Sequence, residues 1–153
     1  LEESNKILED YRKNINKYLG WVMEKPERMK ELKSIYVING ENFINEKIIG
    51  TVSSIIVAGL PSSEKPLIAY ANVENENAAK FSSRTTEAAI RKGVNLGEVM
   101  RLASEKFGGK GGGHNIAAGA QVPLDKIEGF VKTVDELVGK QLRGEKIGSK
   151  DNA

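Results

Sequence analysis

Residues 107–119 read Phe-Gly-Gly-Lys-Gly-Gly-Gly-His-Asn-Ile-Ala-Ala-Gly, and six of these thirteen positions are glycine. Because glycine loses more backbone entropy on folding than any other residue, such a run requires a reason. One reason is a flexible linker. The other is close approach of the backbone to a ligand, in which several N–H groups turn toward one anion. Lys110 adds charge and His114 can donate a hydrogen bond or a proton, so we favour a phosphate cradle.

Two common glycine-rich nucleotide motifs do not fit this stretch. The P-loop pattern requires a serine or threonine directly after its lysine, and Lys110 is followed by glycine. The dinucleotide-binding pattern requires a preceding strand, whereas the residues before Gly108 have the periodicity of a helix. The sequence therefore argues against both classes of nucleotide-binding fold.

Hydrophobic periodicity on both sides of the glycines predicts interspersed helices and strands. Asn95 is expected to cap a helix over residues 96–107, with Glu98 as its capping-box partner. Further helices are expected over residues 3–23, 48–60 and 86–92 and from Pro123 onward, with a helical turn through Met29 and Leu32. Strands are expected over residues 34–39, 66–73, 78–84 and 117–122, the second and third forming a hairpin. This order predicts an α/β (α+β) domain with an N-terminal helical extension.

Arg84 is the second candidate site residue. Residues 81–86 read Phe-Ser-Ser-Arg-Thr-Thr, which places a guanidinium among four hydroxyl side chains at the end of a predicted strand. Such a group offers a fork of donors to phosphate or sugar oxygens. The alternative is a surface arginine beside a helix cap formed by Thr85 or Thr86.

Composition limits the chemistry of the chain. It has 153 residues, 39% hydrophobic and 29% charged, and a formal net charge of +2. The absence of cysteine excludes disulfides, thiolate metal sites and cysteine nucleophiles, and a single histidine excludes a multi-histidine metal cage. No run of 18 apolar residues occurs, so we expect no segment that spans a membrane and no membrane partner. The absence of cysteine is compatible with a cytoplasmic location, which we expect. Positive charge gathers in residues 78–120, and charge alone fits a phosphate-binding face and an ordinary solvated surface equally well.

The two candidate motifs together resemble the DHH-associated domain, which is the C-terminal substrate-binding domain of DHH phosphoesterases. The resemblance rests on Ser83-Arg84, a helix over residues 96–107, and then Gly111-Gly112-Gly113-His114-Asn115-Ile116-Ala117-Ala118-Gly119. It covers roughly residues 34–140 and is greatest for archaeal RecJ-like nucleases, which are related to Cdc45. It implies a mixed β-sheet flanked by helices.

The resemblance also implies roles for individual residues. Arg84 would contact a phosphate, and His114 would hydrogen-bond a phosphate near the cleavage site as an auxiliary catalytic group. Gly112 and Gly113 would present backbone N–H groups. The other residues assigned to phosphate or nucleic-acid binding are Ser83, Lys110, Gly111 and Asn115.

In this family a separate N-terminal domain holds two Mn²⁺ or Mg²⁺ ions that activate a water. This sequence has no Asp-His-His motif, so we expect no cofactor in this fragment, Mn²⁺ or Mg²⁺ in a missing catalytic domain, and no hydrolysis by the fragment alone. Residues 1–33 are expected to be a helical connector from that domain, residues 34–140 the substrate-binding domain, and residues 141–153 a flexible tail.

Three functions follow from the resemblance. The first is binding of single-stranded DNA or RNA for an exonuclease of replication or repair. The second is docking to the GINS complex, through residues 3–23 or the apolar residues 48–60, although we favour core packing for the latter. The third is a DHH oligoribonuclease or cyclic-dinucleotide phosphodiesterase. Alanyl-tRNA synthetases share the domain, but no synthetase-specific feature is visible.

Overall fold

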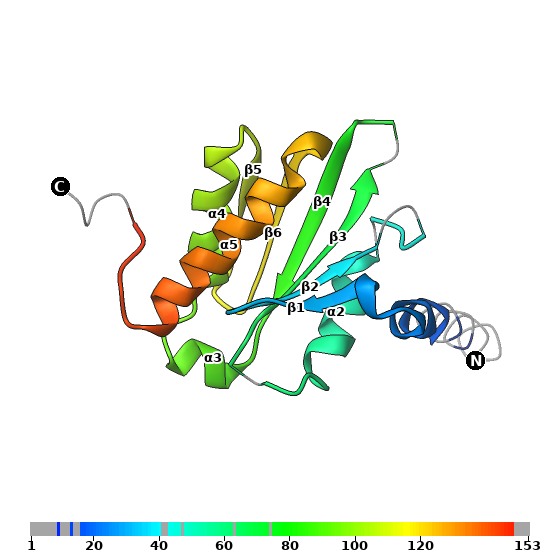
Figure 1. The fold of residues 1–153 in the computed structure, drawn as a ribbon, viewed down its shortest axis with the longest axis horizontal. Helices are drawn as coiled ribbons and strands as arrows, with labels where there is room; N and C mark the ends of the chain where they lie inside the picture. The colour runs from blue at the N-terminus through cyan, green and yellow to red at the C-terminus, as the bar shows by residue number, and fades with distance from the viewer. Residues whose placement is uncertain are drawn as a thin grey trace, which may run out of the picture.

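The computed structural model describes residues 9, 13, 16–40, 43–46, 48–62, 64–73 and 75–148 of the chain. Its centre is a mixed sheet with the strand order β1-β2-β3-β4-β6-β5 (Figure 1). The β2–β3 pair is parallel and the other pairs are antiparallel. The strands are β1 (Met29–Glu31), β2 (Tyr36–Asn39), β3 (Leu67–Val73), β4 (Ala78–Arg84), β5 (Lys110–Gly113) and β6 (Ala117–Pro123).

Helices cover the two faces of this sheet, as the α/β (α+β) prediction requires (Figure 1). On one face lie α4 (Leu96–Lys106) and α5 (Ile127–Leu142), and on the other lies α2 (Ile49–Val57). The short helix α3 (Glu87–Arg91) follows β4, and two 3-10 turns are η1 (Pro26–Arg28) and η2 (Leu124–Lys126). Residues 16–24 are also helical, as are residues 9 and 13, and the rest of the predicted 3–23 helix lies outside the described residues.

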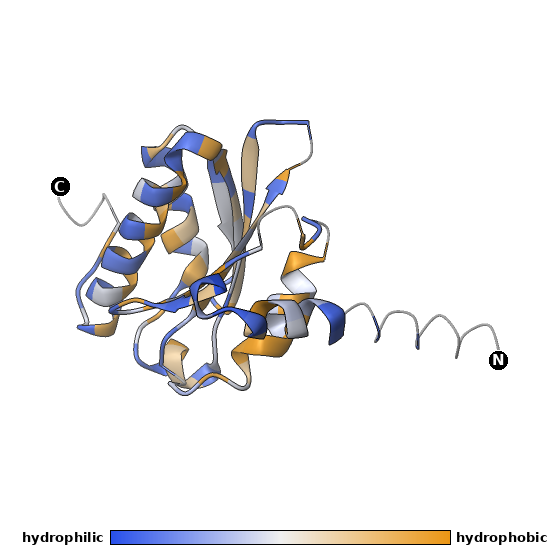
Figure 2. Cartoon of the chain, turned by 45° about the vertical axis from the view of Figure 1, so that its right-hand side comes forward, coloured by the Kyte–Doolittle hydropathy of each residue, from blue (hydrophilic) through white to orange (hydrophobic). Residues whose placement is uncertain are grey.

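Each face of the sheet has its own hydrophobic core. The first core joins α4 and α5 to the sheet through Phe81, Met100 and Phe130, all fully buried. Each turn of the helix α5 carries both hydrophilic and hydrophobic residues (Figure 2), so the helix has a hydrophobic side that packs on this core. The second core joins α2 and the helical residues 16–24 to the other face through Val22 and Val52. Both segments considered for docking thus contribute to a core.

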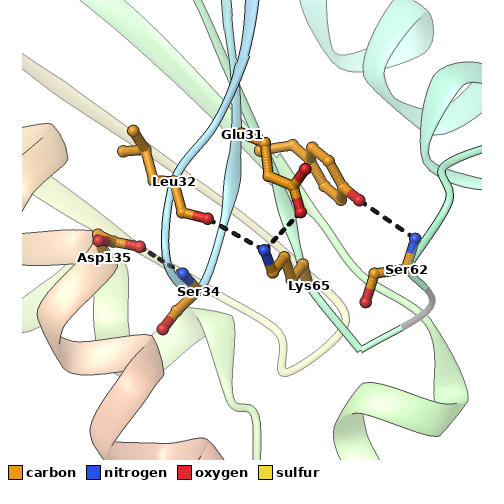
Figure 3. A network of polar contacts seen from close by, with 7 residues as sticks. Glu31, Leu32, Ser34, Ser62, Lys65 and Asp135 are labelled. Atoms are coloured by element: carbon orange, nitrogen blue, oxygen red, sulfur yellow. Dashed lines mark hydrogen bonds and ion pairs between the residues drawn. The ribbon is translucent and has the colours of Figure 1, made fainter.

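The predicted helical turn through Met29 and Leu32 is wrong. The turn ends at Arg28, and Met29–Glu31 forms β1, which pairs antiparallel with β2. The Leu32 amide donates to the Ile35 carbonyl at 2.8 Å, which closes this hairpin. Polar contacts fix it further (Figure 3): the Ser34 amide donates to Asp135 on α5 at 2.8 Å, and the Lys65 ammonium lies 2.6 Å from the Glu31 carboxylate.

The other strand predictions are confirmed, and β4 has the predicted bounds. The glycine-rich stretch adds a strand that the sequence did not predict, because Lys110–Gly113 forms β5 at the edge of the sheet. Beyond residue 140, α5 continues to Leu142, Gln141 is buried, and Ile147 packs against the first core. No helix among the described residues is long and apolar enough to span a membrane.

Candidate functional site

The candidate site is an open part of the sheet, formed by β4, β6 and β5 on the face away from α4. Side chains alternate between the two faces of a strand. Phe81 and Ala120 belong to the first core, and a Cβ on Gly111 would meet Met100 and Ser104 of α4, so these positions face the helices. The alternate positions of β4, β6 and β5 therefore face the opposite side.

Strand register arranges these alternate positions in three rows. Arg84 pairs with Ala117, and the His114 amide donates to the Ala117 carbonyl at 2.8 Å. The first row is thus Arg84–Ala117–His114, the second is Ser82–Gly119–Gly112, and the third is Lys80–Gln121–Lys110. We call these three rows the cationic trough. Its sides are β4 and β5, whose backbones lie about 10 Å apart because one strand separates them.

The first two rows, together with Lys80 of the third row, line a hollow of about 550 Å³. Arg84 and His114 stand at its sides, and small residues form its floor at Ala117 and Gly119. Gly112 has a φ of +155°, and a Cβ placed on it would meet nothing within 4 Å. A ligand can therefore approach the backbone at Gly112 closely.

Arg84 lacks an acceptor for one of its donors. Its Nε is buried and has no hydrogen-bond partner among the described residues. A buried donor left unsatisfied costs about 1–3 kcal/mol, so a phosphate oxygen that accepts from Arg84 would remove a penalty as well as adding a charge-assisted bond.

The first turn of α2 completes the hollow. Gly50 and Thr51 line it, and this turn carries no acidic residue. The N-terminus of a helix carries a partial positive charge. Within the part of the chain that the structure describes, no acidic residue lines this hollow. Its electrostatics therefore favour an anion.

Two glycines of the β5 stretch have different roles. A Cβ on Gly111 would lie 2.7 Å from the Met100 carbonyl oxygen and 2.8 Å from Ser104 Oγ. Gly111 therefore permits α4 to pack against β5, whereas Gly112 faces the trough.

Register also decides where the backbone amides of β5 point. Hydrogen-bonded pairs alternate along an antiparallel ladder, and His114 forms one with Ala117. The Gly112 amide is therefore directed toward β6, and those of Gly111 and Gly113 toward the outer edge of β5. The expected pair of N–H donors at Gly112 and Gly113 consequently points in two directions.

The structure separates two of the expected contacts from the hollow. Ser83 is fully buried and its hydroxyl donates to the Ala118 carbonyl at 2.8 Å, so it faces the first core. Asn115 is exposed, and its carbonyl accepts from the Leu96 amide at 3.0 Å, which attaches the β5–β6 turn to the start of α4. Lys110 lies in the third row.

Sequence reasoning missed Ser82, Lys80, Gly50 and Thr51. Strand alternation backward from Arg84 would have found Ser82 and Lys80, because residues two and four positions apart share a face. Nothing in the sequence indicates that α2 begins over β4, since that is a tertiary contact. The described residues include no group of three or more His, Cys, Asp or Glu side chains that could hold a metal ion.

Comparisons with known proteins agree with this architecture. The family model described as the DHHA1 domain matches residues 32–140. The uncharacterized protein MJ0831 of Methanocaldococcus jannaschii is 40% identical over 139 residues, which is 91% of this chain and 28% of that protein. The chain therefore spans about a quarter of the length of this curated relative.

Solved structures share the fold at low sequence identity. The structure of RecJ from Thermus thermophilus with Mn²⁺ aligns with this chain at a TM-score of 0.63 and 18% sequence identity. The alignment covers 91% of this chain and 18% of the RecJ chain. The structure of the pGpG-specific phosphodiesterase PggH from Vibrio cholerae aligns at a TM-score of 0.64 and 18% sequence identity. The alignment covers 92% of this chain and 44% of the PggH chain. The C-Ala domain of Aquifex aeolicus alanyl-tRNA synthetase aligns at a TM-score of 0.55 and 16% sequence identity. The alignment covers 71% of this chain and 95% of the C-Ala chain.

Proposed function

This chain belongs to the DHHA1 domain family, and on that premise we propose that it is the phosphate-backbone-binding part of a single-strand-specific, metal-dependent exonuclease of the RecJ type, acting in DNA replication and repair. The observation that supports the proposal most directly is the row formed by Arg84, Ala117 and His114. It sets two donor side chains on either side of a small residue, next to a hollow whose described lining has no acidic groups.

In the proposed mechanism the first row holds one phosphate of the substrate. Arg84 donates from its guanidinium, whose Nε is already desolvated, and His114 donates from the opposite side. The absence of a side chain at Gly112 lets the phosphate descend to the sheet. These contacts fix the position of the phosphodiester, and such positioning accelerates attack by a nucleophile supplied elsewhere.

The Mn²⁺ or Mg²⁺ ions implied by the resemblance do not fit the described residues, which offer no suitable cluster of ligands. We therefore place the metal ions and the hydrolytic step in a separate catalytic domain of a longer protein. In that arrangement residues 34–140 bind the substrate.

Binding of a labelled ten-nucleotide single strand to this chain tests the proposal. Arg84→Ala and His114→Ala should each weaken binding about tenfold or more, because each removes a charged or strongly polar contact to phosphate. Arg101→Ala is the matched control, since Arg101 is exposed on α4, away from the trough, and its ion pair with Glu105 is exposed as well. Equal binding by all variants and the unsubstituted chain would refute the proposal.

A second candidate function is docking of a protein partner such as GINS. The observation in its favour is a groove of about 650 Å³ between α5 and the β1–β2 edge. Its lining combines hydrophobic and aromatic residues with charged ones: Leu32, Val37, Tyr70, Leu124, Ile127 and Val131 with Lys30, Asp125, Glu128, Lys132 and Asp135. The groove lies on the opposite face of the sheet from the trough. Val131→Lys should abolish retention of purified GINS by the immobilised chain and leave single-strand binding intact. Retention by that variant would exclude docking through the groove.

A DHH oligoribonuclease or cyclic-dinucleotide phosphodiesterase would hold a phosphate with the same first row. These enzymes act on short substrates, whereas an exonuclease follows a long strand. The number of successive phosphates that the trough contacts therefore separates the alternatives.

A further inference from the structure

We propose that Lys80 and Lys110 form a second phosphate subsite in the cationic trough, so that its ligand is a polynucleotide strand spanning at least two phosphates. This inference rests on the proposed function, because the first subsite is the Arg84–His114 row. It adds Lys80 to the binding residues and gives Lys110 a defined place.

The two subsites are parts of one continuous surface. A second hollow of about 590 Å³ adjoins the first and shares Lys80, Gly112 and Gly119 with it. In the third row Gln121 lies between Lys80 and Lys110, just as Ala117 lies between Arg84 and His114. The second subsite thus resembles the first in its arrangement across β6, but both of its outer side chains are lysines, Lys80 from β4 and Lys110 from β5.

Spacing along the strands indicates two phosphates rather than one. Lys80 precedes Arg84 by four residues on the same face of β4, which separates their backbones by about 13 Å. The Arg84 guanidinium reaches toward the second row, because a Cβ added at Gly50 would lie 3.6 Å from Arg84 Nη2 and 3.3 Å from Ser82 Oγ. Arg84 and His114 nevertheless line only the first hollow, and Lys110 lines only the second. A polynucleotide that contacts Lys110 as well as Arg84 and His114 therefore spans both hollows.

The lysines of the second subsite are available for a ligand. Lys80 and Lys110 are both exposed. No salt bridge within the described part of the chain involves either of them. The Gln121 amide between them is exposed too and can donate to a phosphate or sugar oxygen.

Acidic residues mark the far end of the trough. Glu46 and Glu76 line the second hollow near Val73, beyond Lys80 as seen from Arg84. Carboxylates repel phosphate, so Glu46 and Glu76 oppose Lys80 and Lys110 within the second hollow. The potential there is less favourable to phosphate than in the first hollow, whose described lining has no acidic residue. The surface therefore favours about two phosphate rows and limits further contact in that direction.

The test compares Lys80→Ala/Lys110→Ala with a control of equal charge change, Lys126→Ala/Lys140→Ala, whose exposed side chains lie at the start and within α5. Two probes are used: a ten-nucleotide oligothymidylate and a nucleoside monophosphate. The double trough variant should bind the oligonucleotide about tenfold more weakly at low salt. It should lose less affinity for the monophosphate, because Lys80 also lines the first hollow but Lys110 does not. The magnitude of the slope of log K against log salt should fall by about 0.7, since the variant loses one phosphate contact and each single-strand phosphate contact contributes about 0.7.

The outcomes distinguish this inference from the proposed function. If the trough variant matches the control with both probes, the second subsite is refuted. If Arg84→Ala still weakens binding of both probes in that case, the proposed function survives without the second subsite. If Arg84→Ala also has no effect, both fail. Should the alanine variant unfold, Lys80→Gln/Lys110→Gln keeps the aliphatic stems and is expected to give the same loss and the same change of slope.

Discussion

Gly50, in the first turn of α2, lies directly over Arg84. A Cβ at Gly50 would come within 3.6 Å of Arg84 Nη2 and within 3.3 Å of Ser82 Oγ. The helix can approach β4 this closely because residue 50 has no side chain, and the approach buries Arg84 Nε. The position of the guanidinium therefore depends on a glycine from a different element.

Gly50→Val should displace Arg84 and weaken single-strand binding about tenfold, with a small effect on the free energy of unfolding. The two extra methyl groups have to enter space that the guanidinium occupies. Gly50→Ala is the control, since its Cβ meets only ordinary or slightly tight contacts and alanine favours a helix. Binding by the valine variant equal to that of the alanine variant would show that α2 does not position Arg84.

Gly111→Ala should lower the free energy of unfolding by about 1–3 kcal/mol, as overpacking does. The added Cβ would lie 2.7 Å from the Met100 carbonyl oxygen and 2.9 Å from Ala120 Cβ, and neither backbone can move alone. Gly20→Ala should have the opposite effect. Gly20 lies in the helical residues 16–24, and nothing lies within 4 Å of a Cβ added there. Because alanine favours a helix over glycine, this substitution should raise the free energy of unfolding by up to about 1 kcal/mol. Urea unfolding measures the free energy of unfolding of both variants. An unchanged free energy of unfolding for Gly111→Ala would contradict the close packing described for α4 and β5.

Gln141→Ala should destabilise the chain by about 2 kcal/mol. The buried Gln141 amide accepts from the Asn95 amide at 3.0 Å and donates to the Asn95 carbonyl at 3.3 Å. Truncation leaves both backbone groups without these partners. Lys140→Ala, one residue earlier on α5 and exposed, controls for a general effect of substitution there. Thermal unfolding that is the same for both variants would mean that the Gln141 contact contributes nothing.

Asp135→Ala should cost about 1 kcal/mol of unfolding free energy, because the Ser34 amide loses the acceptor shown in Figure 3. Asp135→Asn keeps an oxygen acceptor and should recover most of the loss. Glu31→Gln, which removes the exposed charge opposite Lys65, should change stability by less than about 1 kcal/mol. Denaturant titrations of the three variants rank them by their free energy of unfolding. An equal loss of stability for Asp135→Ala and Asp135→Asn would count against a stabilising hydrogen bond from the Ser34 amide.

Much of the fold is predictable from the sequence wherever hydrophobic side chains recur with the periodicity of a helix or a strand. The predicted bounds of β4, Ala78–Arg84, are those observed, and Asn95 caps α4 through a bond from the Glu98 amide at 3.2 Å. The glycines of β5 carry no side chains, so no alternation indicates a strand, and glycine disfavours strands. Only pairing with β6 makes Lys110–Gly113 extended.

The site was predictable in part for the same reason. Residue type and the family resemblance together predict Arg84 and His114 as site residues, and the register places these two residues in one row. Their contact with phosphate stays a prediction. The prediction also includes Ser83, but adjacent strand residues point to opposite faces, so Ser82 lines the hollow and Ser83 does not.

The middle strand β6 has one further consequence. It separates the donors of β4 from those of β5 by a distance that sheet hydrogen bonding sets, independent of any loop conformation. In the proposed role, this fixed width lets one sugar-phosphate chain lie between the donors of the two sides. Contacts of this kind recognise charge and backbone, so binding should not depend on which bases the chain carries.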